Sequence, residues 1–368
     1  MNIPFVDLKS QYLSIKEEID NAISSVITET AFIKGKYVKS FEQEYAKLYK
    51  VKDCISCANG TDAIYIALKS LGISEGDEVI TVSNTWISTA ETITQAGAKP
   101  VFVDIDEYHN IDTSKIEEKI NNKTKAIIAV HLYGLPAKIK EISQLCEKFN
   151  LKLIEDCAQS HLAEYEGKLA GTYGDIATFS FFPGKNLGAY GDAGAIITNN
   201  DSYADFCRKY SNHGSLIKHQ HEIEGINSRL DGLQAAILSV KMKYIEEWTQ
   251  KRINNAKYYD KLFKNNKHIV TPSVYSGAKH VYHLYVIKCD RRDELKLYLE
   301  DKGISVAIHY PSPLPFLEAY EHLNLAESDF PVSKGYQAKI LSLPMYPELS
   351  MDQIEYVNKT VCAFYETE

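Results

Sequence analysis

The sequence of 368 residues predicts an α/β protein, with a large lobe built on a mostly parallel sheet and a smaller α+β lobe at the C-terminal end. Two observations lead to this prediction. Short β-branched segments alternate with helical patterns between residues 50 and 200, which is typical of βαβ units. The chain also exceeds the roughly 250–300 residues at which single hydrophobic cores stop growing, so a second lobe is expected.

The elements of the large lobe follow from composition and periodicity. The expected strands are, in chain order, DEVITV, KPVFVDI, KAIIAVHLY, LKLIED, IATFSF and GAIITN. Helical periodicity in TDAIYIALKSLG, STAETITQAG and AKIKEISQLCEKFN predicts helices between several of these strands. Ligands of such sheets bind at the carboxyl ends of the strands, so functional residues are expected there.

The part of the chain after residue 229 predicts one long helix and then the small lobe. Apolar residues recur at spacings of three and four and continue toward RINNAKYYDKLF; they are Leu230, Leu233, Ile237, Val240, Tyr244 and Trp248. The segments HVYHLYVIKC, DELKLYLEDKG, VAIHYPSP and LSLPMYP predict the α+β pattern. We expect a large domain over 13–240 and a small domain over 241–368, with residues 1–12 as a candidate segment of the small domain.

Composition and charge argue against several classes of protein. The formal net charge of −8 does not suit a general nucleic-acid-binding protein, which needs a broad basic face. No apolar run approaches the roughly 18–20 residues that span a bilayer, and the start MNIPFVDLKSQYL lacks a basic leader. The seven cysteines suit a reducing compartment better than a disulfide framework. The sequence thus predicts a cytoplasmic protein with neither nucleic-acid nor membrane partners.

Two short motifs raise the question of a metal site. Cys54 and Cys57 form a CxxC, and His219 and His221 form an HxH. Neither motif is accompanied by further ligands at metal-binding spacing. We therefore expect no metal, and interpret the two cysteines as small buried hydrophobes and the two histidines as part of a solvated loop.

The turn in SCANGTDAIYIAL is the first candidate binding feature. Gly60 and Thr61 lie where a strand passes into a helix, so free backbone N–H groups and the helix dipole face the turn. This geometry suits a phosphate. The alternative is an ordinary capped helix start, with Asn59, Thr61 or Asp62 as the N-cap.

The end of LKLIEDCAQSH is the second candidate. Asp156 ends an apolar strand, with Gln159 and His161 close behind it, so a carboxylate lies at the ligand-binding edge. A buried carboxylate needs a partner because an unpaired buried charge is costly. The alternative is that Asp156 caps the following turn.

Lys185 is the third candidate and the only cation in TFSFFPGKNLGAYGDAGAI. Glycines on both sides of Lys185 allow the backbone to approach a ligand closely. An ammonium in such a place either pairs with an acid or has its pKa lowered, and a neutral lysine is a nucleophile toward carbonyls. A phosphate-binding turn, a strand-end carboxylate and a desolvated lysine together indicate pyridoxal 5′-phosphate as cofactor.

Motifs along nearly the whole chain resemble those of the DegT/DnrJ/EryC1/StrS family of nucleotide-sugar aminotransferases. They are EDCAQSH, GDIATFSFFPGKNLGAYGDAGAI, NHGS, GINSRLDGLQAAIL, HYPSPLP and SLPMYPELS. The resemblance implies the fold-type I, aspartate-aminotransferase-like architecture of pyridoxal-phosphate enzymes. It also implies a homodimer with active sites at the subunit interface.

The resemblance further implies roles for individual residues that hold the cofactor. Lys185 resembles the lysine that bonds to the cofactor and moves the proton, Asp156 the partner of the pyridine nitrogen, and Gln159 the residue near the ring hydroxyl. The residues that match the phosphate contacts are Gly60, Thr61 and Ser180, with Asn227 matching one that reaches the neighbouring subunit's cofactor. Trp86 matches an aromatic over the ring face.

Substrate contacts are the least specific part of the resemblance. Arg229, Tyr310 and His161 are the candidates, although Arg229 suits an interface ion pair equally and His161 suits a structural histidine. Ser180 and Trp86 have alternatives too, as a backbone-bonded strand serine and a core aromatic. Two positions depart from the family pattern: Leu162 replaces a common glycine, and Phe316 replaces a frequent histidine.

The implied activity is a ping-pong transamination of a nucleotide-linked keto-sugar, with L-glutamate as amino donor. Asn186, directly after Lys185, favours a dTDP-linked 3-keto-6-deoxyhexose as substrate. A 4-keto sugar and a UDP-linked 3-keto sugar are the alternatives. Lys185 argues against the family's dehydratases, in which a histidine replaces this lysine. A catalytically idle cofactor-binding regulator is a further alternative.

Overall fold

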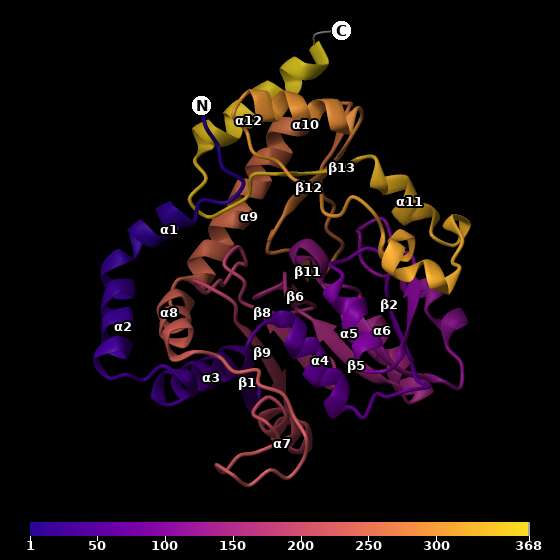
Figure 1. The fold of residues 1–368 in the computed structure, drawn as a ribbon. Coiled ribbons are helices and arrows are strands. Elements are labelled where there is room, and N and C mark those ends of the chain that lie inside the picture. The colour runs from indigo at the N-terminus through magenta and orange to yellow at the C-terminus, as the bar shows by residue number, and fades with distance from the viewer. Residues whose placement is uncertain (367–368) are drawn as a thin grey trace.

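The computed structural model describes residues 1–366 and consists of two lobes, the large one below the small one in Figure 1. Helix α9 (Ile245–Phe263) runs from the large lobe to the top of the small lobe, where both chain ends lie. No helix within the described residues is long and apolar enough to cross a membrane.

A seven-stranded sheet forms the centre of the large lobe, in the order β1-β9-β8-β5-β4-β2-β3. Only β9 runs against its neighbours, and the remaining strands are parallel to one another. The strands are β1 (Asp53–Cys57), β2 (Glu78–Val82), β3 (Lys99–Val103), β4 (Thr124–Val130), β5 (Lys152–Asp156), β8 (Ile176–Ser180) and β9 (Gly194–Thr198). This confirms the predicted mostly parallel sheet and its expected strands.

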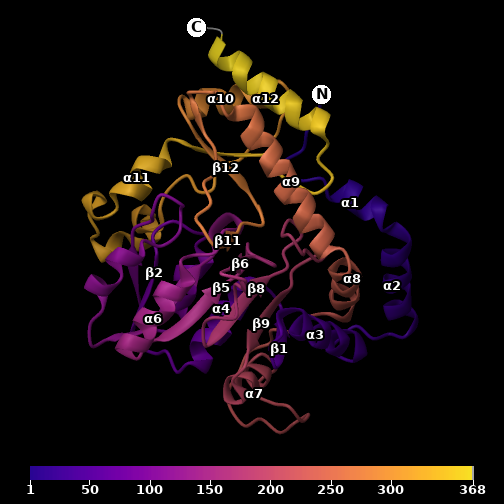
Figure 2. The ribbon, with the colours of Figure 1, turned by 180° about the vertical axis from the view of Figure 1, so that it is seen from behind.

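Helices cover both faces of this sheet because successive strand residues point to opposite sides. In β8, Ile176 packs toward α4 and α7, whereas Ala177 and Phe179 pack toward α3 and α8. The helices of this lobe and its N-terminal arm are α1 (Leu8–Ser14), α2 (Lys16–Thr28), α3 (Lys36–Tyr49), α4 (Gly60–Ser70), α5 (Ser88–Gln95), α6 (Ile139–Phe149), α7 (Asp201–Tyr210) and α8 (Gly232–Met242). Figure 2 shows the same layers from behind.

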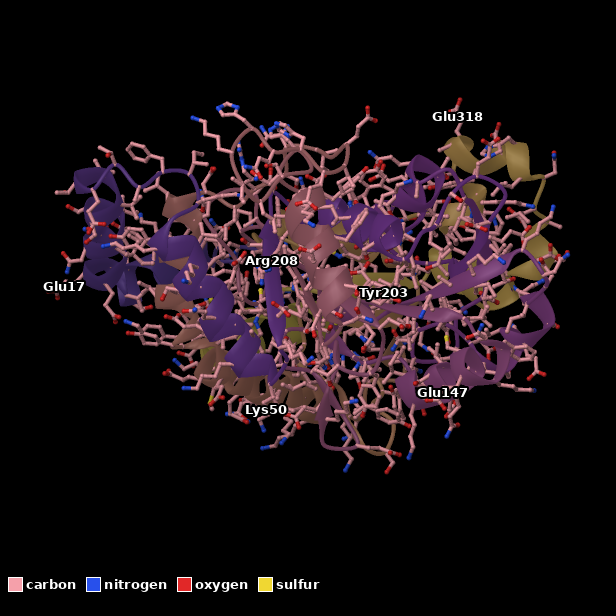
Figure 3. All side chains as sticks on the ribbon, turned by 90° about the horizontal axis from the view of Figure 1, so that it is seen from below. Glu17, Lys50, Glu147, Tyr203, Arg208 and Glu318 are labelled. Carbon is pink, nitrogen blue, oxygen red and sulfur yellow. The ribbon has the colours of Figure 1, made fainter. Side chains whose placement is uncertain are left out.

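The free edge of β1 is closed by side chains instead of another strand. Arg208 of α7 donates to the carbonyl of Cys54 at 3.2 Å and to Asp53 at 2.9 Å, and Glu42 of α3 accepts from the backbone of Ser56 at 2.9 Å. Figure 3 shows this side of the molecule from below, with Arg208 near its centre. These bonds satisfy backbone groups that an exposed edge would leave open to other strands.

The small lobe has a three-stranded antiparallel sheet, β10-β12-β13, covered by helices. Its elements are β10 (Ile269–Val270), β12 (Tyr285–Cys289), α10 (Arg292–Asp301), α11 (Pro331–Gln337), β13 (Ile340–Leu343) and α12 (Met351–Glu366). Ile3 pairs with Ile304 and lies in the core of this lobe. The predicted domain boundary at residue 240 stays a prediction.

A third, small sheet joins the two lobes. Its strands are β6 (Glu164–Tyr165), β7 (Lys168–Leu169) and β11 (Ala278–Lys279), and β11 comes from the small-lobe half of the chain. The remaining 3₁₀ turns are η1 (Thr113–Lys115), η2 (Glu117–Lys119), η3 (Leu132–Gly134), η4 (Leu314–Phe316), η5 (Glu318–Leu323) and η6 (Glu327–Asp329).

The expected single long helix is instead two helices, α8 and α9, so that part of the prediction was wrong. The break lies at Lys243 and Tyr244, whose backbone N–H groups bond three residues back, to Val240 and Lys241, at 3.2 and 3.0 Å. The apolar spacing of three and four passes across this tightened turn unchanged, and periodicity alone therefore does not reveal it.

Candidate active site

The carboxyl ends of β1, β5 and β8 lie at one edge of the large sheet. Cys57 of β1 and Ser180 of β8 both pair with Gly194, the first residue of β9, and Asp156 of β5 pairs with Thr178 of β8. The first two candidate features therefore lie at the same edge of the sheet, at the ends of β1 and β5, with β9 and β8 between them. The loop that carries Lys185 begins directly after β8.

The turn at Gly60 forms a small cradle with Ser180. A Cβ atom on Gly60 would lie 2.6 Å from the Cβ of Ser180, so only glycine fits where these segments touch. Asn59 caps α4 by accepting from the backbone of Asp62 at 2.8 Å. The N–H groups of Gly60 and Thr61, in the first turn of α4, have no intrahelical partner and suit an anion.

Hydroxyl groups surround this cradle. The Oγ1 atom of Thr61 lies 2.7 Å from the Oγ of Ser88, the first residue of α5. Ser180 Oγ accepts from the backbone of Phe182 at 3.3 Å, as in the alternative of a backbone-bonded serine, and its hydroxyl proton remains available to an acceptor. The donors present thus fit a phosphate group.

Asp156 is buried at the end of β5. Its carboxylate accepts from Thr89 Oγ1 at 3.0 Å and from the backbone of Ala158 at 3.1 Å. Burial raises the pKa of Asp156 above its usual value, while these hydrogen bonds and the charge of Lys185 act in the opposite direction. A carboxylate held in this way can accept a proton donor such as a protonated ring nitrogen.

The neighbouring Glu155 points to the other face of the strand and is fully occupied. It accepts from His131 Nε2 at 3.0 Å and from the backbone of Gly171, Tyr173 and Gly174 at 2.7 Å each. His131 Nδ1 accepts from Ala137, so its Nε2 carries the proton. Although His131, Glu155 and Cys157 lie close enough to hold a metal, these bonds use the carboxylate to anchor β5.

Gln159 connects three aromatic residues around the site. Its amide accepts from the backbone of Tyr133 at 2.7 Å and donates to the hydroxyl of Tyr310 at 3.1 Å. The Tyr310 ring lies 5.9 Å from the ring of Trp86. Trp86 is 59% exposed, which does not agree with the alternative of a core aromatic and leaves its indole available to a ligand.

Lys185 lies in the loop between β8 and β9, where its backbone N–H donates to Phe182 at 2.8 Å. Burial lowers the pKa of Lys185 to about 8, against the opposing effect of Asp156. The residue is partly buried, and its ammonium forms no hydrogen bond within residues 1–366. The lysine is thus partly neutral near physiological pH and suited to attack a carbonyl.

His161 lies behind the lysine rather than on an open surface. It is fully buried between the rings of Phe179 and Phe181, each 5.5 Å away, and neither ring nitrogen has a hydrogen-bond partner within the described residues. Burial and the charge of Lys185 lower the pKa of His161 to about 3. Its contact with substrate stays a prediction.

Asn227 and Arg229 lie on either side of Ser228, which is buried and bonds to Asp62 at 2.6 Å and to Ala58 at 3.0 Å. This serine ties their segment to the turn at Gly60. Asn227 is exposed, and Arg229 lines a hollow of about 540 Å³. Neither side chain bonds another predicted site residue within the described part of the chain.

The structure explains the two departures from the family pattern. Leu162 has a φ of +62°, a conformation that favours glycine, and its backbone donates to Tyr49 at 3.1 Å. Phe316 packs edge-on against Phe330 at 5.9 Å, beneath the ammonium of Lys334. It therefore forms part of a small apolar cluster.

Sequence reasoning missed two residues. Thr89 and Tyr133 bond the predicted site residues, and only Thr89, in the segment NTWISTAET after β2, has a position that points to the site. Asn186, interpreted above as an indication of substrate, is buried and bonds the carbonyl of Val281 at 3.2 Å and His283 at 3.3 Å. It connects the lysine loop to the segment entering the small lobe.

Known proteins resemble this chain over nearly its whole length. The model of the DegT/DnrJ/EryC1/StrS aminotransferase family matches residues 13–362. A "pleiotropic regulatory protein" of Geobacillus stearothermophilus is 45% identical over 99% of both chains. The dTDP-3-amino-3,6-dideoxy-alpha-D-galactopyranose transaminase of Aneurinibacillus thermoaerophilus is 42% identical over 98% of both chains.

Solved structures also resemble this chain over nearly its whole length. The crystal structure of DesV from S. venezuelae superposes with a TM-score of 0.97 at 35% identity, covering 99% of both chains. That of NtdA from Bacillus subtilis, with bound cofactor PMP, has a TM-score of 0.91 at 31% identity and covers 99% of this chain and 85% of NtdA. These matches confirm the predicted fold-type I architecture.

The anchor at Glu155 yields a stability prediction. Glu155→Gln places an NH₂ group against backbone N–H donors, and leaving one or two buried donors unpaired costs about 1–3 kcal/mol each. We expect urea denaturation to show a loss of roughly 2–5 kcal/mol. Glu164→Gln, which removes an ion pair with Lys279 at the surface, should cost less than about 1 kcal/mol. Equal midpoints for Glu155→Gln and the unchanged protein would contradict the anchor.

The pKa of Lys185 yields a kinetic prediction. Only the neutral amine attacks a carbonyl, so the rate at which pyridoxal phosphate attaches to cofactor-free protein should rise about tenfold per pH unit below pH 8 and level off above it. Borohydride trapping followed by mass spectrometry of the Lys185 peptide measures this rate. A rate that continues to rise toward pH 10.5 would show that burial does not lower the pKa.

Proposed function

This chain belongs to the DegT/DnrJ/EryC1/StrS aminotransferase family, and we propose that it transfers an amino group from L-glutamate to a dTDP-linked 3-keto-6-deoxyhexose. It is a pyridoxal-phosphate-dependent nucleotide-sugar aminotransferase; the sugar, the nucleotide and the donor belong to the proposal. The observation that carries it is Lys185, desolvated in its loop and electrostatically coupled to the buried Asp156.

The donors at the strand ends fit the cofactor. Gly60, Thr61 and Ser180 would hold its phosphate, and Asp156 would bind the pyridine nitrogen. Gln159 would lie near the ring hydroxyl, and the exposed Trp86 would cover one ring face. When bound, pyridoxal phosphate supplies a carbonyl that exchanges amines and a ring that withdraws electrons from the substrate carbon.

Lys185 performs the proton transfer in this proposal. Its pKa of about 8 lies near physiological pH, which allows the same Nζ atom to accept a proton from one carbon and donate it to another. Thr89 and the backbone of Ala158 orient the Asp156 carboxylate and favour its ionised form against the effect of burial on its pKa. The apolar rings of Phe179 and Phe181 next to the loop keep the lysine's surroundings poor in water.

The choice of substrate is supported by sequence similarity. The relative from Aneurinibacillus thermoaerophilus is named for a dTDP-linked 3-amino-6-deoxy sugar and covers the chain almost completely. Asn186 supports this choice less than its position suggested, because its side chain bonds the protein itself. A 4-keto sugar or a UDP-linked 3-keto sugar is the alternative substrate.

We further propose that the enzyme is a homodimer with its active sites at the subunit interface. Asn227 is exposed near the turn at Gly60, so it is available to the cofactor of a second subunit. Arg229 and Tyr310 are the proposed substrate contacts, Arg229 from the rim of the 540 Å³ hollow and Tyr310 from beside Trp86.

A second candidate function is a cofactor-binding regulator without catalytic activity, which the name of the Geobacillus relative favours. Both functions predict a long-wavelength absorption band when the protein binds pyridoxal phosphate. Only the aminotransferase predicts that L-glutamate bleaches this band with release of 2-oxoglutarate. A band that glutamate leaves unchanged would contradict the proposed donor.

Lys185→Ala should reduce this glutamate half-reaction by more than roughly a hundredfold, because the proton-transfer group is lost. Stopped-flow absorbance measures the rate. Lys243→Ala, which changes an exposed lysine, serves as the control and should react as the unchanged protein does. Full activity of the Lys185 variant would exclude this lysine as the reactive group.

Substrate identity is tested with dTDP- and UDP-linked 3-keto and 4-keto sugars, offered to the glutamate-treated enzyme. We expect the dTDP-linked 3-keto-6-deoxyhexose to restore the absorption band fastest, with the new amine located at carbon 3 by NMR. Faster conversion of a UDP-linked or 4-keto sugar would replace the proposed substrate with that one.

A further inference from the structure

Lys241 is a lysine whose side chain is fully removed from water. It lies in α8 with a fully buried side chain, and its Nζ donates to the carbonyl of Gly188 at 2.7 Å. No carboxylate within residues 1–366 forms an ion pair with it, and burial lowers its pKa to about 8 against the opposing charge of Glu348. A buried charge costs several kcal/mol, so the bond to Gly188 compensates for a large penalty.

A second polar side chain on the same helix reaches the same loop. Gln234, seven residues or about two turns before Lys241, accepts from the backbone of Tyr190 at 2.8 Å. The ammonium of Lys241 also lies 4.3 Å from the centre of the Tyr190 ring. Between Gln234 and Lys241, α8 buries Ala235 and Leu238 against the large lobe. The two polar side chains of α8 therefore both hold the same segment, residues 188–190.

This segment is one arm of the loop that carries Lys185. A Cβ atom on Gly188 would lie 2.3 Å from the carbonyl oxygen of Pro183, so the two arms of the loop touch. The backbone of Ala189 donates to Phe181 at 2.8 Å, which closes the loop at its base. A displacement of Gly188 must therefore move the arm from which Lys185 extends.

We propose that Lys241 is a positioning residue, which fixes the carbonyl of Gly188 and so the direction in which Lys185 presents its Nζ atom. This inference depends on the proposed function of Lys185. Lys241 is fully buried and donates to the carbonyl of Gly188, whereas Lys185 is partly buried and its ammonium forms no such bond within the described residues.

The test compares Lys241→Met, Lys241→Arg and the surface control Lys243→Met as full-length, cofactor-free proteins. Methionine keeps the apolar stem and removes the donor, and arginine restores a donor. We expect Lys241→Met to increase amide hydrogen exchange in residues 182–190 about tenfold and to slow pyridoxal phosphate attachment at Lys185 about tenfold. Lys241→Arg should return both the hydrogen exchange and the attachment rate most of the way to those of the unchanged protein. Lys243→Met should match the unchanged protein in both measurements.

The two measurements separate this inference from the proposed function. If the unchanged protein never attaches pyridoxal phosphate at Lys185, the proposed function fails. Hydrogen exchange in residues 182–190 still tests whether Lys241 fixes the loop. A folded Lys241→Met variant with unchanged exchange and attachment would overturn the inference. If that variant does not fold, Gln234→Leu takes its place in the test. Unchanged amide hydrogen exchange and unchanged attachment of pyridoxal phosphate in Gln234→Leu would then overturn the inference.

Discussion

The last two residues of β5 place two carboxylates in the interior, and the geometry of the site depends on how each is satisfied. Glu155 uses both oxygens on His131 and on three backbone N–H groups of the following segment. Asp156, on the opposite face, accepts hydrogen bonds from only two donors within residues 1–366. The hydrogen bonds of Glu155 are all made within the protein and fix the end of β5. Asp156 is therefore held in a fixed position and can still accept a hydrogen bond from a ligand.

A similar division applies to Lys241 and Lys185. The ammonium of Lys241 bonds the carbonyl of Gly188 and lies over the ring of Tyr190, whereas the ammonium of Lys185 forms no hydrogen bond within the described residues. A lowered pKa therefore does not by itself identify the reactive group. The unoccupied member of each pair, Asp156 and Lys185, lies at the carboxyl edge of the sheet, where the cradle of Gly60 and Ser180 also opens. Together these groups make up the cofactor site proposed for the enzyme.

Much of this arrangement follows from the sequence because local patterns encode it. Strand periodicity located β5 and β8, and the glycine-bounded lysine and the strand-end Asp156 indicated the cofactor. The break between α8 and α9 was not predictable from apolar spacing, which continues across it. Thr89, Tyr133 and Lys241 act through contacts between segments distant in sequence. The bonds of Asn186 were not predictable for the same reason, since its partners lie almost a hundred residues further on.

The most direct test of this account is a crystal structure of the protein incubated with pyridoxal phosphate. The account predicts continuous density between the cofactor and the Nζ of Lys185, with the phosphate against Gly60, Thr61 and Ser180 and the ring nitrogen at Asp156. Attachment to Lys241, or a cofactor bound away from the ends of β5 and β8, would contradict it.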